Sequence, residues 1–563
     1  MFIKLIENGE DGEKNMMKKK TLRVYSRIPV EGQYPNGLAY SVHMALGESE
    51  AEVIEGENCQ TKKDIEWKPL HNDYGILFPK ADIDERNVII PKFAADIRIA
   101  EVCSTGNTEC GNNANGALKA ENVDSKKQFP GEHQFSSYYI TGADVVSEGY
   151  YGQADMANES EGDGKGGQCF WTWVTEDFVN YEECGLLTAD ELEKRTGLSL
   201  TQLREKDSVK ISDEIAVKIS KKWDSTKVEE YVGLPENEAL RSLKEQKDFQ
   251  KFPLARGFGD PVILFWEDEY YFIATNDNVG DIGLYVRKSH TIDGLFAEDI
   301  EMHLILDKDE KRHLIQTFWA PEFHVIGGRL CILFAVSNEQ WGPKCHMMRL
   351  KENGDILKAS DWEDPVEVKR AGGLILGAHG ITLDMTYVKS GSRHYYVWSY
   401  RENIGSPLDS GSMIMVGEFD PENPTELITE PVCLSRPLYG FENTRGTINN
   451  EGPYAFYHNE KIYLTYSGGD ARGYLYTTCL LTAKDGDNLC DPGVWEKAKT
   501  PALSFASVPG VYGPGHNSFF RDRNGDWWIA FHAVTDYQEK VISDCFRRVV
   551  YDDNGEPRFD GVM

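Results

Sequence analysis

The sequence contains no apolar run of 18 residues, no CxxC cysteine pair and fewer basic than acidic residues. A membrane-spanning helix needs about 20 consecutive apolar residues, so none is predicted. The stretch 1–27 also lacks the apolar core of a secretory signal. The eleven cysteines stand singly, and a chain of this length builds a core without disulfides, so reduced thiols are expected. Together these absences predict a cytoplasmic protein.

The charge balance argues against partners that carry a strong negative charge. The chain has 92 acidic and 60 basic residues, which gives a formal net charge of -32. Such a surface has no positive field to attract phosphate groups, so neither nucleic acid nor an anionic membrane is expected to bind. Neutral substrates are unaffected, and the acidic excess also serves simply to keep a protein soluble.

The length of 563 residues exceeds one ordinary hydrophobic core and predicts several domains. Strand-like stretches rich in aromatic residues outnumber helix-period stretches, so the fold class is expected to be all-β. A loop insertion rich in Gly, Asn, Ser and Glu covers 104–168, and Thr188 is a candidate helix N-cap. We divide the chain into a flexible N-terminus (1–19), a β-rich N-terminal module (20–190), a helical linker (191–254) and a β domain (255–563).

A short aromatic strand recurs in the C-terminal half. Its copies are EYYFIATND, RLCILFAVS, HYYVWSYR, KIYLTYSGG and DWWIAFHA. Their second residues stand 60 to 67 positions apart: Tyr270, Leu330, Tyr395, Ile462 and Trp527. A repeat of this size indicates one supersecondary unit, and a four-stranded sheet fits the period. Five such sheets around an axis predict a five-bladed β-propeller, with a long β-sandwich as the alternative.

Five side chains with distinctive surroundings stand ten or eleven positions before these strand residues. They are Asp260 (GFGDPV), Trp319 (FWAPEF), Asp384 (ITLDMT), Glu451 (NNEGPY) and His516 (GPGHNS). Equivalent positions of a propeller lie at equivalent radii, so all five are expected to face the central funnel. Taken singly, each is also explained as a turn, strand-end or core residue. Burying three carboxyl groups and a histidine together is costly, and their shared register therefore favours a functional site.

Three carboxyl groups around one cavity suit the hydrolysis of a glycosidic bond. One protonated carboxyl donates to the departing oxygen, and one ionised carboxyl activates water from about 6.5–9.5 Å away in an inverting enzyme. A third negative charge raises the pKa of the acid. The longer side chain of Glu451 suits the acid, Asp260 before its proline suits the base, and Asp384 is then the modulator.

The same strings resemble glycoside hydrolase family 43. The resemblance runs from about Gly257 to Val562 through GFGDPVILFWEDEYYFIATND, FWAPEFHVIGGRLCILFA, GITLDMTYV, NNEGPYAFYHNEKIYLTYSG and YGPGHNSFFRDRNGDWWIAFHA, and CFRRVVYDDNGEPRFDG resembles its terminal motif. It implies a five-bladed propeller of inverting enzymes, with Asp260 as general base, Glu451 as general acid and Asp384 as modulator of the acid's pKa.

The resemblance also implies further site residues. Trp319 and Glu322 match a wall of the substrate pocket, and an arginine facing the sugar is either Arg547 or Arg548, of which we take Arg547. His516 matches a histidine that helps to hold a structural calcium ion through water, while the chemistry itself requires no cofactor.

The family acts on several related sugars. LTAKDGDNLCDPGVWEK and VYGPGHNSFF are similar to strings of arabinofuranose-removing members. We therefore expect an exo-acting α-L-arabinofuranosidase acting on oligosaccharides from arabinan or arabinoxylan. A β-xylosidase, a β-galactofuranosidase and, in a different class, a non-catalytic carbohydrate-binding propeller are the alternatives. LAYSVHMALGE and NDYGILFPKA resemble a leading module, which would shape the pocket, bind carbohydrate or support a homo-oligomer.

Overall fold

The computed structural model describes residues 19–49, 65–103, 136–145, 168–444 and 447–563. The predicted flexible N-terminus up to residue 18 and most of the predicted loop insertion in 104–168 lie outside these ranges. The described chain consists mainly of β-strands with few and short helices, which confirms the all-β fold class. In these ranges no helix has the length and apolar character needed to cross a membrane.

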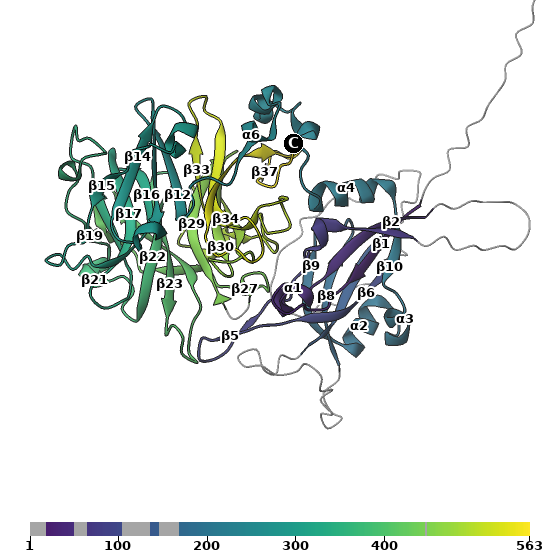
Figure 1. Ribbon diagram of the computed structural model, residues 1–563. Helices are drawn as coiled ribbons and strands as arrows, with labels where there is room; N and C mark the ends of the chain where they lie inside the picture. Colours follow the sequence, from purple (N-terminus) through teal and green to yellow (C-terminus); the bar gives the residue numbers. More distant parts are fainter. Residues whose placement is uncertain (1–18, 50–64, 104–135, 146–167, 445–446) are drawn as a thin grey trace, which may run out of the picture.

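Two four-stranded antiparallel sheets make up the N-terminal part, drawn in purple and blue in Figure 1. Their strand orders are β10-β1-β2-β3 and β6-β7-β8-β9. Leu22, Trp173 and Ile219 belong to one buried cluster that joins both sheets to helix α4 (Asp213–Trp223). The strands are β1 (Lys19–Tyr25), β2 (His43–Ser49), β3 (Glu66–Pro69), β6 (Ala94–Cys103), β7 (Ser136–Asp144), β8 (Cys169–Thr175), β9 (Glu182–Thr188) and β10 (Ser208–Ile211).

The predicted helical linker contains more than helices. Thr188 caps α2 (Ala189–Thr196) as predicted: its N–H donates to the Glu191 carboxylate at 2.9 Å, and its hydroxyl accepts from the Glu191 N–H at 3.4 Å. This reciprocal pair is a capping box. Strand β10 lies in the same stretch but pairs with β1, so the chain there packs with the N-terminal sheets. The remaining helices are α3 (Leu200–Arg204), α5 (Val228–Tyr231) and α6 (Gln246–Phe249).

Five sheets follow in chain order. Their strand pairs are antiparallel except for β20 (Lys369–Arg370) with β25 (Asn423–Leu427) in the third sheet, which also contains β21 (Leu374–Ile375) and β26 (Val432–Ser435). In the order of the chain, the first strand of each sheet is β12 (Phe258–Trp266), β16 (Gln316–Ile326), β22 (Gly380–Ser390), β29 (Asn450–His458) and β33 (Tyr512–Arg521). The second strands are β13 (Glu269–Asn276), β17 (Arg329–Ser337), β23 (Arg393–Glu402), β30 (Lys461–Gly468) and β34 (Trp527–Val534). The outer strands are β14 (Leu284–Ser289), β15 (His303–Leu306), β18 (Lys344–Arg349), β19 (Val366–Glu367), β24 (Met413–Asp420), β25 (Asn423–Leu427), β31 (Thr477–Lys484), β32 (Glu496–Lys497), β35 (Ser543–Arg548) and β11 (Gln250–Lys251).

The five recurring aromatic strands of the sequence are the second strands of these sheets. Tyr270 and Trp527, for example, lie on β13 and β34. Nearly every residue of β13, β17, β30 and β34 is buried, as is the middle of β23 (Tyr395–Ser399), because both faces of each sheet are covered by a neighbouring sheet. Strands covered on both faces read as continuous apolar runs rather than as alternating patterns, which explains the repeat.

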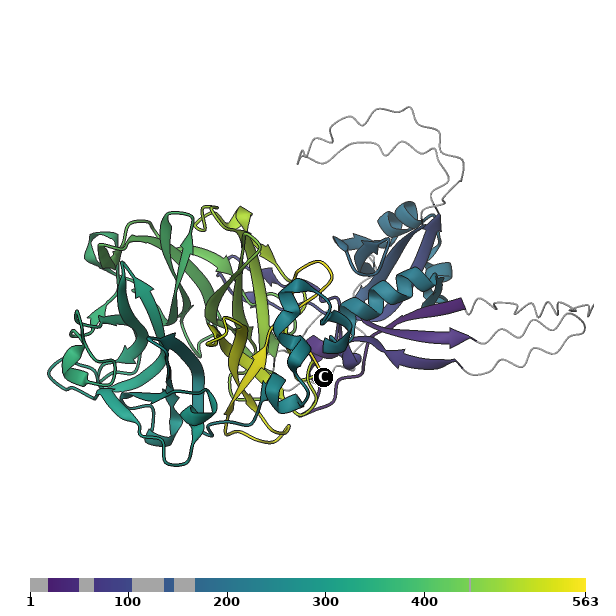
Figure 2. The same ribbon diagram turned by 90° about the horizontal axis from the view of Figure 1, so that it is seen from above.

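The sheets pack in cyclic order. A separate hydrophobic cluster fills each junction between successive sheets, and the last sheet packs against the first through Phe258, Phe520 and Phe546. The first strands contact one another in the same order, and β33 also contacts β12. Strand β11, which precedes the first sheet, pairs with β35 of the last. Figure 2 shows the five sheets from above, beside the N-terminal part.

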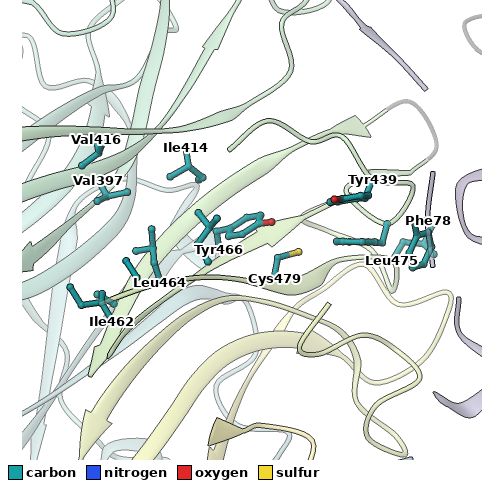
Figure 3. Close-up of a cluster of buried hydrophobic side chains, with 14 of the residues drawn as sticks. Phe78, Val397, Ile414, Val416, Tyr439, Ile462, Leu464, Tyr466, Leu475 and Cys479 are labelled. Carbon is teal, nitrogen blue, oxygen red and sulfur yellow. The ribbon is translucent and has the colours of Figure 1, made fainter. Parts of the chain in front are cut away.

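The N-terminal part shares a core with the third and fourth sheets. The cluster between these two sheets extends to Tyr34, Tyr74 and Phe78 of the N-terminal part. Figure 3 shows it running from Ile462 and Leu464 toward Phe78, whose ring lies 5.0 Å from that of Phe441. The N-terminal part is therefore joined to the five sheets through buried apolar contacts.

Candidate active site

One cavity of about 150 Å³ gathers the side chains that the repeat aligned. Asp260, Trp319, Asp384, Glu451 and His516 all line it. Each comes from the first strand of a different sheet, so the packing of five sheets around a centre brings together residues that are far apart in the chain.

Each first strand has a β-bulge at the same place, and the bulge directs these side chains toward the cavity. Asp260, Asp384 and His516 are the bulge residues of β12, β22 and β33, with φ values of 57°, 54° and 47°. The left-handed conformation costs a residue with a side chain roughly 1–2 kcal/mol, and such strain concentrates at functional sites. The equivalent bulge residues of β16 and β29 are Ala320 and Gly452.

This register corrects the sequence alignment in one respect. Trp319 and Glu451 precede the bulge residue by one position and are not equivalent to Asp260, Asp384 and His516. The physical reason is that the reference residues of the second strands are not equivalent. Tyr270, Leu330 and Ile462 follow the residue that closes the hairpin by one position, whereas Tyr395 follows it by two and Trp527 itself closes a longer turn. Both side chains nevertheless line the cavity.

The Asp260 carboxylate is held by two side-chain donors. Oδ2 accepts a hydrogen bond from the Thr275 hydroxyl at 2.5 Å, and Oδ1 lies 3.0 Å from Nδ1 of His516. Burial raises the pKa of this carboxyl, but the charge and hydrogen bond of His516 outweigh it and hold the pKa well below its ordinary value. Asp260 is therefore ionised at neutral pH and fixed in orientation.

His532 supports Asp260 from the main chain. The Asp260 N–H donates to Nδ1 of His532 at 3.2 Å, and Nε2 of His532 lies 3.2 Å from the Ala471 carbonyl. These two contacts select the neutral tautomer with the proton on Nε2. Sequence reasoning did not identify His532, although it stands in the aromatic strand string DWWIAFHA.

Asp384 is buried, and the pKa of its carboxyl group is raised. Its Oδ2 accepts hydrogen bonds from the Ser399 hydroxyl at 3.0 Å and from the Gly452 N–H at 3.1 Å. Burial raises the pKa of Asp384 to about 7, since the attraction of His516 is offset by the charges of Glu451 and Asp260. The three carboxyl groups thus carry more negative charge than the His516 imidazolium neutralises.

Glu451 is partly buried, like Asp260, whereas Asp384 is fully buried; Glu451 lines the cavity from β29. Its Oε1 accepts a hydrogen bond from the Tyr476 hydroxyl at 2.8 Å. The Tyr476 ring stacks on His532 with 5.5 Å between centroids, so the same buried aromatic pair supports both sides of the site. Tyr476, in the string GYLYTT, was not singled out from the sequence.

His516 is a cation in this setting. Burial lowers the pKa of its imidazole, but the charges of Asp260 and Asp384 outweigh this and raise it to about 10. Its backbone N–H donates to the Ser467 hydroxyl at 2.7 Å. Among the described residues no group of three or more His, Cys, Asp and Glu is arranged to hold a metal. Calcium favours six to eight oxygen ligands, so a water-held calcium at His516 stays a prediction.

A polar chain forms one side of the cavity rim. The Trp319 indole N–H donates to Oδ2 of Asp281 at 2.9 Å, and Nη2 of Arg472 donates to Oδ1 of Asp277 at 3.3 Å. Burial raises the pKa of Asp277 to about 6, with Arg472 opposing and Asp281 adding to the rise. Asp277 and Arg472 both line the cavity. Asp277 ends the repeat string EYYFIATND and starts a short 3-10 helix, whereas Arg472 lies in a loop outside the repeat, where no periodic signal could have identified it.

The structure does not bring Glu322 or Arg547 to the cavity. Glu322 is buried within β16 and accepts a hydrogen bond from Nε2 of His324 at 2.6 Å. Arg547 is fully buried, where its guanidinium donates to the carbonyls of Phe559 and Gly561. Alternation along their strands directs both side chains into the packing between elements. Arg548, the other candidate, donates to Asp526 at 3.0 Å outside the cavity.

Comparisons with known proteins assign the chain to a family. Residues 251–557 match the family described as glycosyl hydrolases family 43. The chain is 32% identical over 294 residues to an extracellular exo-α-(1→5)-L-arabinofuranosidase of Streptomyces chartreusis, which covers 51% of this chain and 83% of that one. A protein of the same name from Streptomyces avermitilis is 26% identical over 326 residues, 55% of this chain and 64% of that one. The crystal structure of an α-L-arabinofuranosidase from Lactobacillus brevis, 25% identical, covers 57% of this chain and 98% of that one with a TM-score of 0.49.

The predicted cytoplasmic location is wrong on this comparison, because both Streptomyces relatives are named extracellular enzymes. The prediction rested on a missing apolar stretch and on single cysteines. Neither feature decides the compartment, because a chain with hydrophobic cores of this size does not need disulfides for its stability.

Proposed function

The chain belongs to glycosyl hydrolases family 43 and is a glycoside hydrolase, and from this premise we propose that it is an inverting, exo-acting α-L-arabinofuranosidase. The cyclic packing of five sheets supports a five-bladed β-propeller, and the three carboxyl groups around its central cavity supply the chemistry. That convergence of Asp260, Asp384 and Glu451 from three sheets is the observation that carries the proposal.

Asp260 is the proposed general base. An inverting enzyme needs an ionised carboxylate that takes a proton from water while the water attacks the anomeric carbon. The low pKa of Asp260 keeps it ionised, and Thr275 and His516 fix its two oxygens. The neutral His532 ring holds the backbone at the same residue, so the base has one orientation toward the cavity.

Glu451 is the proposed general acid. Asp384 is its proposed negatively charged neighbour. A negative charge favours the protonated form of a nearby carboxyl group. The raised pKa of Asp384 arises in part from the charge of Glu451, so this pair retains a proton near neutral pH. Glu451 donates that proton to the departing oxygen, oriented by the Tyr476 hydroxyl. Asp384 is in turn held by Ser399 and Gly452.

The size of the cavity supports the proposed exo action. Its volume of about 150 Å³ lies below the roughly 300–1,000 Å³ of sites that enclose larger ligands. One terminal sugar fits such a space, while the rest of an oligosaccharide extends through the mouth. The rim formed by Trp319, Asp277 and Arg472 supports the same reading, because it bounds the cavity on one side.

Arabinofuranose is the proposed sugar because relatives from two Streptomyces species are named exo-α-(1→5)-L-arabinofuranosidases. The cavity presents Arg472 in place of the predicted Arg547 as the arginine available to sugar hydroxyls. We propose that Arg472 rather than Arg547 contacts the sugar, because Arg472 is largely exposed at the rim, whereas Arg547 is fully buried.

The experiment compares aryl α-L-arabinofuranoside, β-xyloside and β-galactofuranoside with an arabino-oligosaccharide. The proposal expects the highest kcat/KM on the arabinofuranosides. Glu451→Gln is expected to lose about 10²–10⁴-fold on the oligosaccharide and far less on an aryl substrate, whose leaving group needs little protonation. Asp260→Asn should lose activity on both.

The matched control is Glu460→Gln, an exposed carboxyl in the turn that follows the same strand. It should retain the activity of the unmodified chain on every substrate. Equal oligosaccharide turnover by Glu451→Gln and Glu460→Gln would remove Glu451 from the role of acid. Binding of arabino-oligosaccharides without turnover of any substrate would favour a carbohydrate-binding propeller.

A further inference from the structure

The segment Gly469–Tyr476, here called the rim loop, joins β30 and β31 and reaches the cavity at three points. The Ala471 carbonyl lies 3.2 Å from Nε2 of His532, and Arg472 donates to Asp277 at 3.3 Å. Tyr476, at the end of the loop, donates to Glu451 at 2.8 Å. One loop thus contacts the supporting histidine, the polar rim and the proposed acid.

The N-terminal part contacts this loop at its tip. Val30 and Tyr34 pair across a tight turn, in which Gly32 takes a positive φ of 75°. The Tyr474 hydroxyl donates to the Gln33 carbonyl, and the Gly32 carbonyl lies 3.3 Å away. Tyr474 follows Arg472 by two positions and precedes Tyr476 by two. The contact therefore falls between Arg472, which lines the cavity, and Tyr476, which donates to Glu451.

Aromatic packing fixes both partners of this contact. Phe505 lies against Tyr34, Tyr74 and Tyr474, with ring centroids 6.3, 5.4 and 5.6 Å away. The Arg27 guanidinium covers the other side of the Tyr34 ring at 3.8 Å from its centroid. The N-terminal turn and the rim loop are therefore held against one common ring.

The neighbouring residue Leu475 belongs to the core that Figure 3 shows extending to Phe78. The rim loop is thus packed against the N-terminal part over both an apolar and a polar contact. Its own turns, in which the N–H groups of Gly473 and Tyr476 donate to Asp470 and Gly473, fix its local shape. They do not connect it to the N-terminal part, which Tyr474 does.

We propose that the N-terminal part is a positioning element of the active site, which acts through its Val30–Tyr34 turn on Tyr474 and so places Arg472 and Tyr476 at the cavity. The inference rests on the proposed function for its kinetic readout. It assigns the N-terminal part the role of shaping the pocket. Tyr474 is a positioning residue, since it contacts the cavity through its neighbours in the loop.

Tyr474→Phe in the full chain tests this inference, because it removes the hydroxyl and keeps the ring. Loss of one hydrogen bond corresponds to about a fivefold change in an equilibrium. We expect KM for the aryl arabinofuranoside to rise about fivefold, with a smaller change in kcat. Tyr537→Phe is the matched control, since Tyr537 packs on Tyr474 at 4.9 Å but its hydroxyl makes no hydrogen bond in the described part of the chain. It should leave KM unchanged.

A double-mutant cycle separates positioning from general stability. If Tyr474 acts through Arg472, then Tyr474→Phe adds little to the KM of Arg472→Ala, because the residue that it positions is already absent. Additive effects of the two substitutions on KM would contradict the proposal. An unchanged KM in Tyr474→Phe alone would overturn it as well.

Amide hydrogen exchange provides a readout that is independent of the substrate. Tyr474→Phe should speed exchange in the rim loop by severalfold and leave the strand β13 unchanged, whereas Tyr537→Phe should alter neither. Faster exchange without turnover of any sugar would contradict the proposed function and leave the positioning role supported. Unchanged exchange in the rim loop of an active Tyr474→Phe enzyme would contradict the positioning role and leave the proposed function supported.

Discussion

Nδ1 of His516 lies 3.0 Å from Oδ1 of Asp260, and both residues are the left-handed bulge residues of their strands. The strands β33 and β12 belong to the last and the first of the five sheets, so this ion pair forms where the cycle of sheets closes. The charge that fixes the proposed base thus depends on the correct closure of the fold.

Replacing His516 by Gln should shift the pH dependence of activity. His516 lowers the pKa of Asp260, so its removal lets burial raise that pKa, and the acidic limb of the kcat/KM profile moves to higher pH. Activity at pH 5 should fall more than activity at pH 7. The profile of the unmodified chain, together with His313→Gln at an exposed histidine, provides the comparison. An unmoved acidic limb would show that His516 does not set the charge of the base.

Replacing Asp384 by Asn should change how stability depends on pH. The pKa of Asp384 is raised to about 7, so the folded state holds a proton that the unfolded state releases near pH 4. Stability from this group is therefore present at low pH and is lost as pH rises toward 7. Between pH 5 and 6.5 the unmodified chain should lose stability by about 1–2 kcal/mol more than the variant.

Thermal or denaturant unfolding across that pH range measures the difference. This pH window avoids the titration of the two other buried groups. The raised pKa of His516 contributes stability that is lost only at higher pH, and the lowered pKa of Asp260 affects stability only at lower pH. Parallel stability curves for Asp384→Asn and the unmodified chain would contradict the raised pKa of Asp384.

Gly452→Ala tests whether the bulge next to Glu451 is part of the site. Gly452 has a φ of 56°, and an added Cβ would lie 2.9 Å from the His516 ring. We expect kcat/KM to fall at least tenfold, because either the imidazole or the bulge is displaced. Gly510→Ala is the control: its φ is 78°, but an added Cβ meets no atom within 4 Å. If both variants lose the same activity, backbone strain rather than the His516 contact is the cause.

The Asp277–Arg472 pair should make substrate binding sensitive to pH. The pKa of Asp277 is raised to about 6, so it is ionised and paired with Arg472 above pH 6 and neutral below it. The KM should therefore rise as pH falls from 7 to 5. In Asp277→Asn the KM should be higher at pH 7 and nearly constant over this range. A KM that follows the same pH curve in both proteins would rule out this pair as the cause.

Much of the fold could be predicted because its packing requires apolar residues at regularly repeated positions of the sequence. Each second strand is covered on both faces, so its apolar run repeats whenever a sheet repeats. The polar residues of the first strands stand out against that background. Asp260, Asp384 and Glu451 were identifiable for this reason, and the cavity contains all three.

The remaining features depend on three-dimensional relationships that leave no periodic signal. The one-residue offset of Trp319 and Glu451 arises from differences between the hairpins, because Tyr395 and Trp527 do not stand at the same distance from the turn as the other reference residues. Arg472 lies in a loop, and its place at the cavity depends on neighbouring elements. The contact of Tyr474 with Gln33 uses a main-chain carbonyl, which any residue type provides. Arg547 looks like a site residue in its string but is enclosed by the C-terminal segment.

The most direct test of the central claim is the configuration of the first sugar released, followed by proton NMR during hydrolysis of an α-L-arabinofuranoside. An ionised Asp260 that activates water opposite a protonated Glu451 attacks from the face away from the leaving group, so the β-anomer of arabinose should appear first and the α-anomer only by mutarotation. Initial release of the α-anomer would contradict the account, since it would require one of the carboxylates to act as a nucleophile on the sugar.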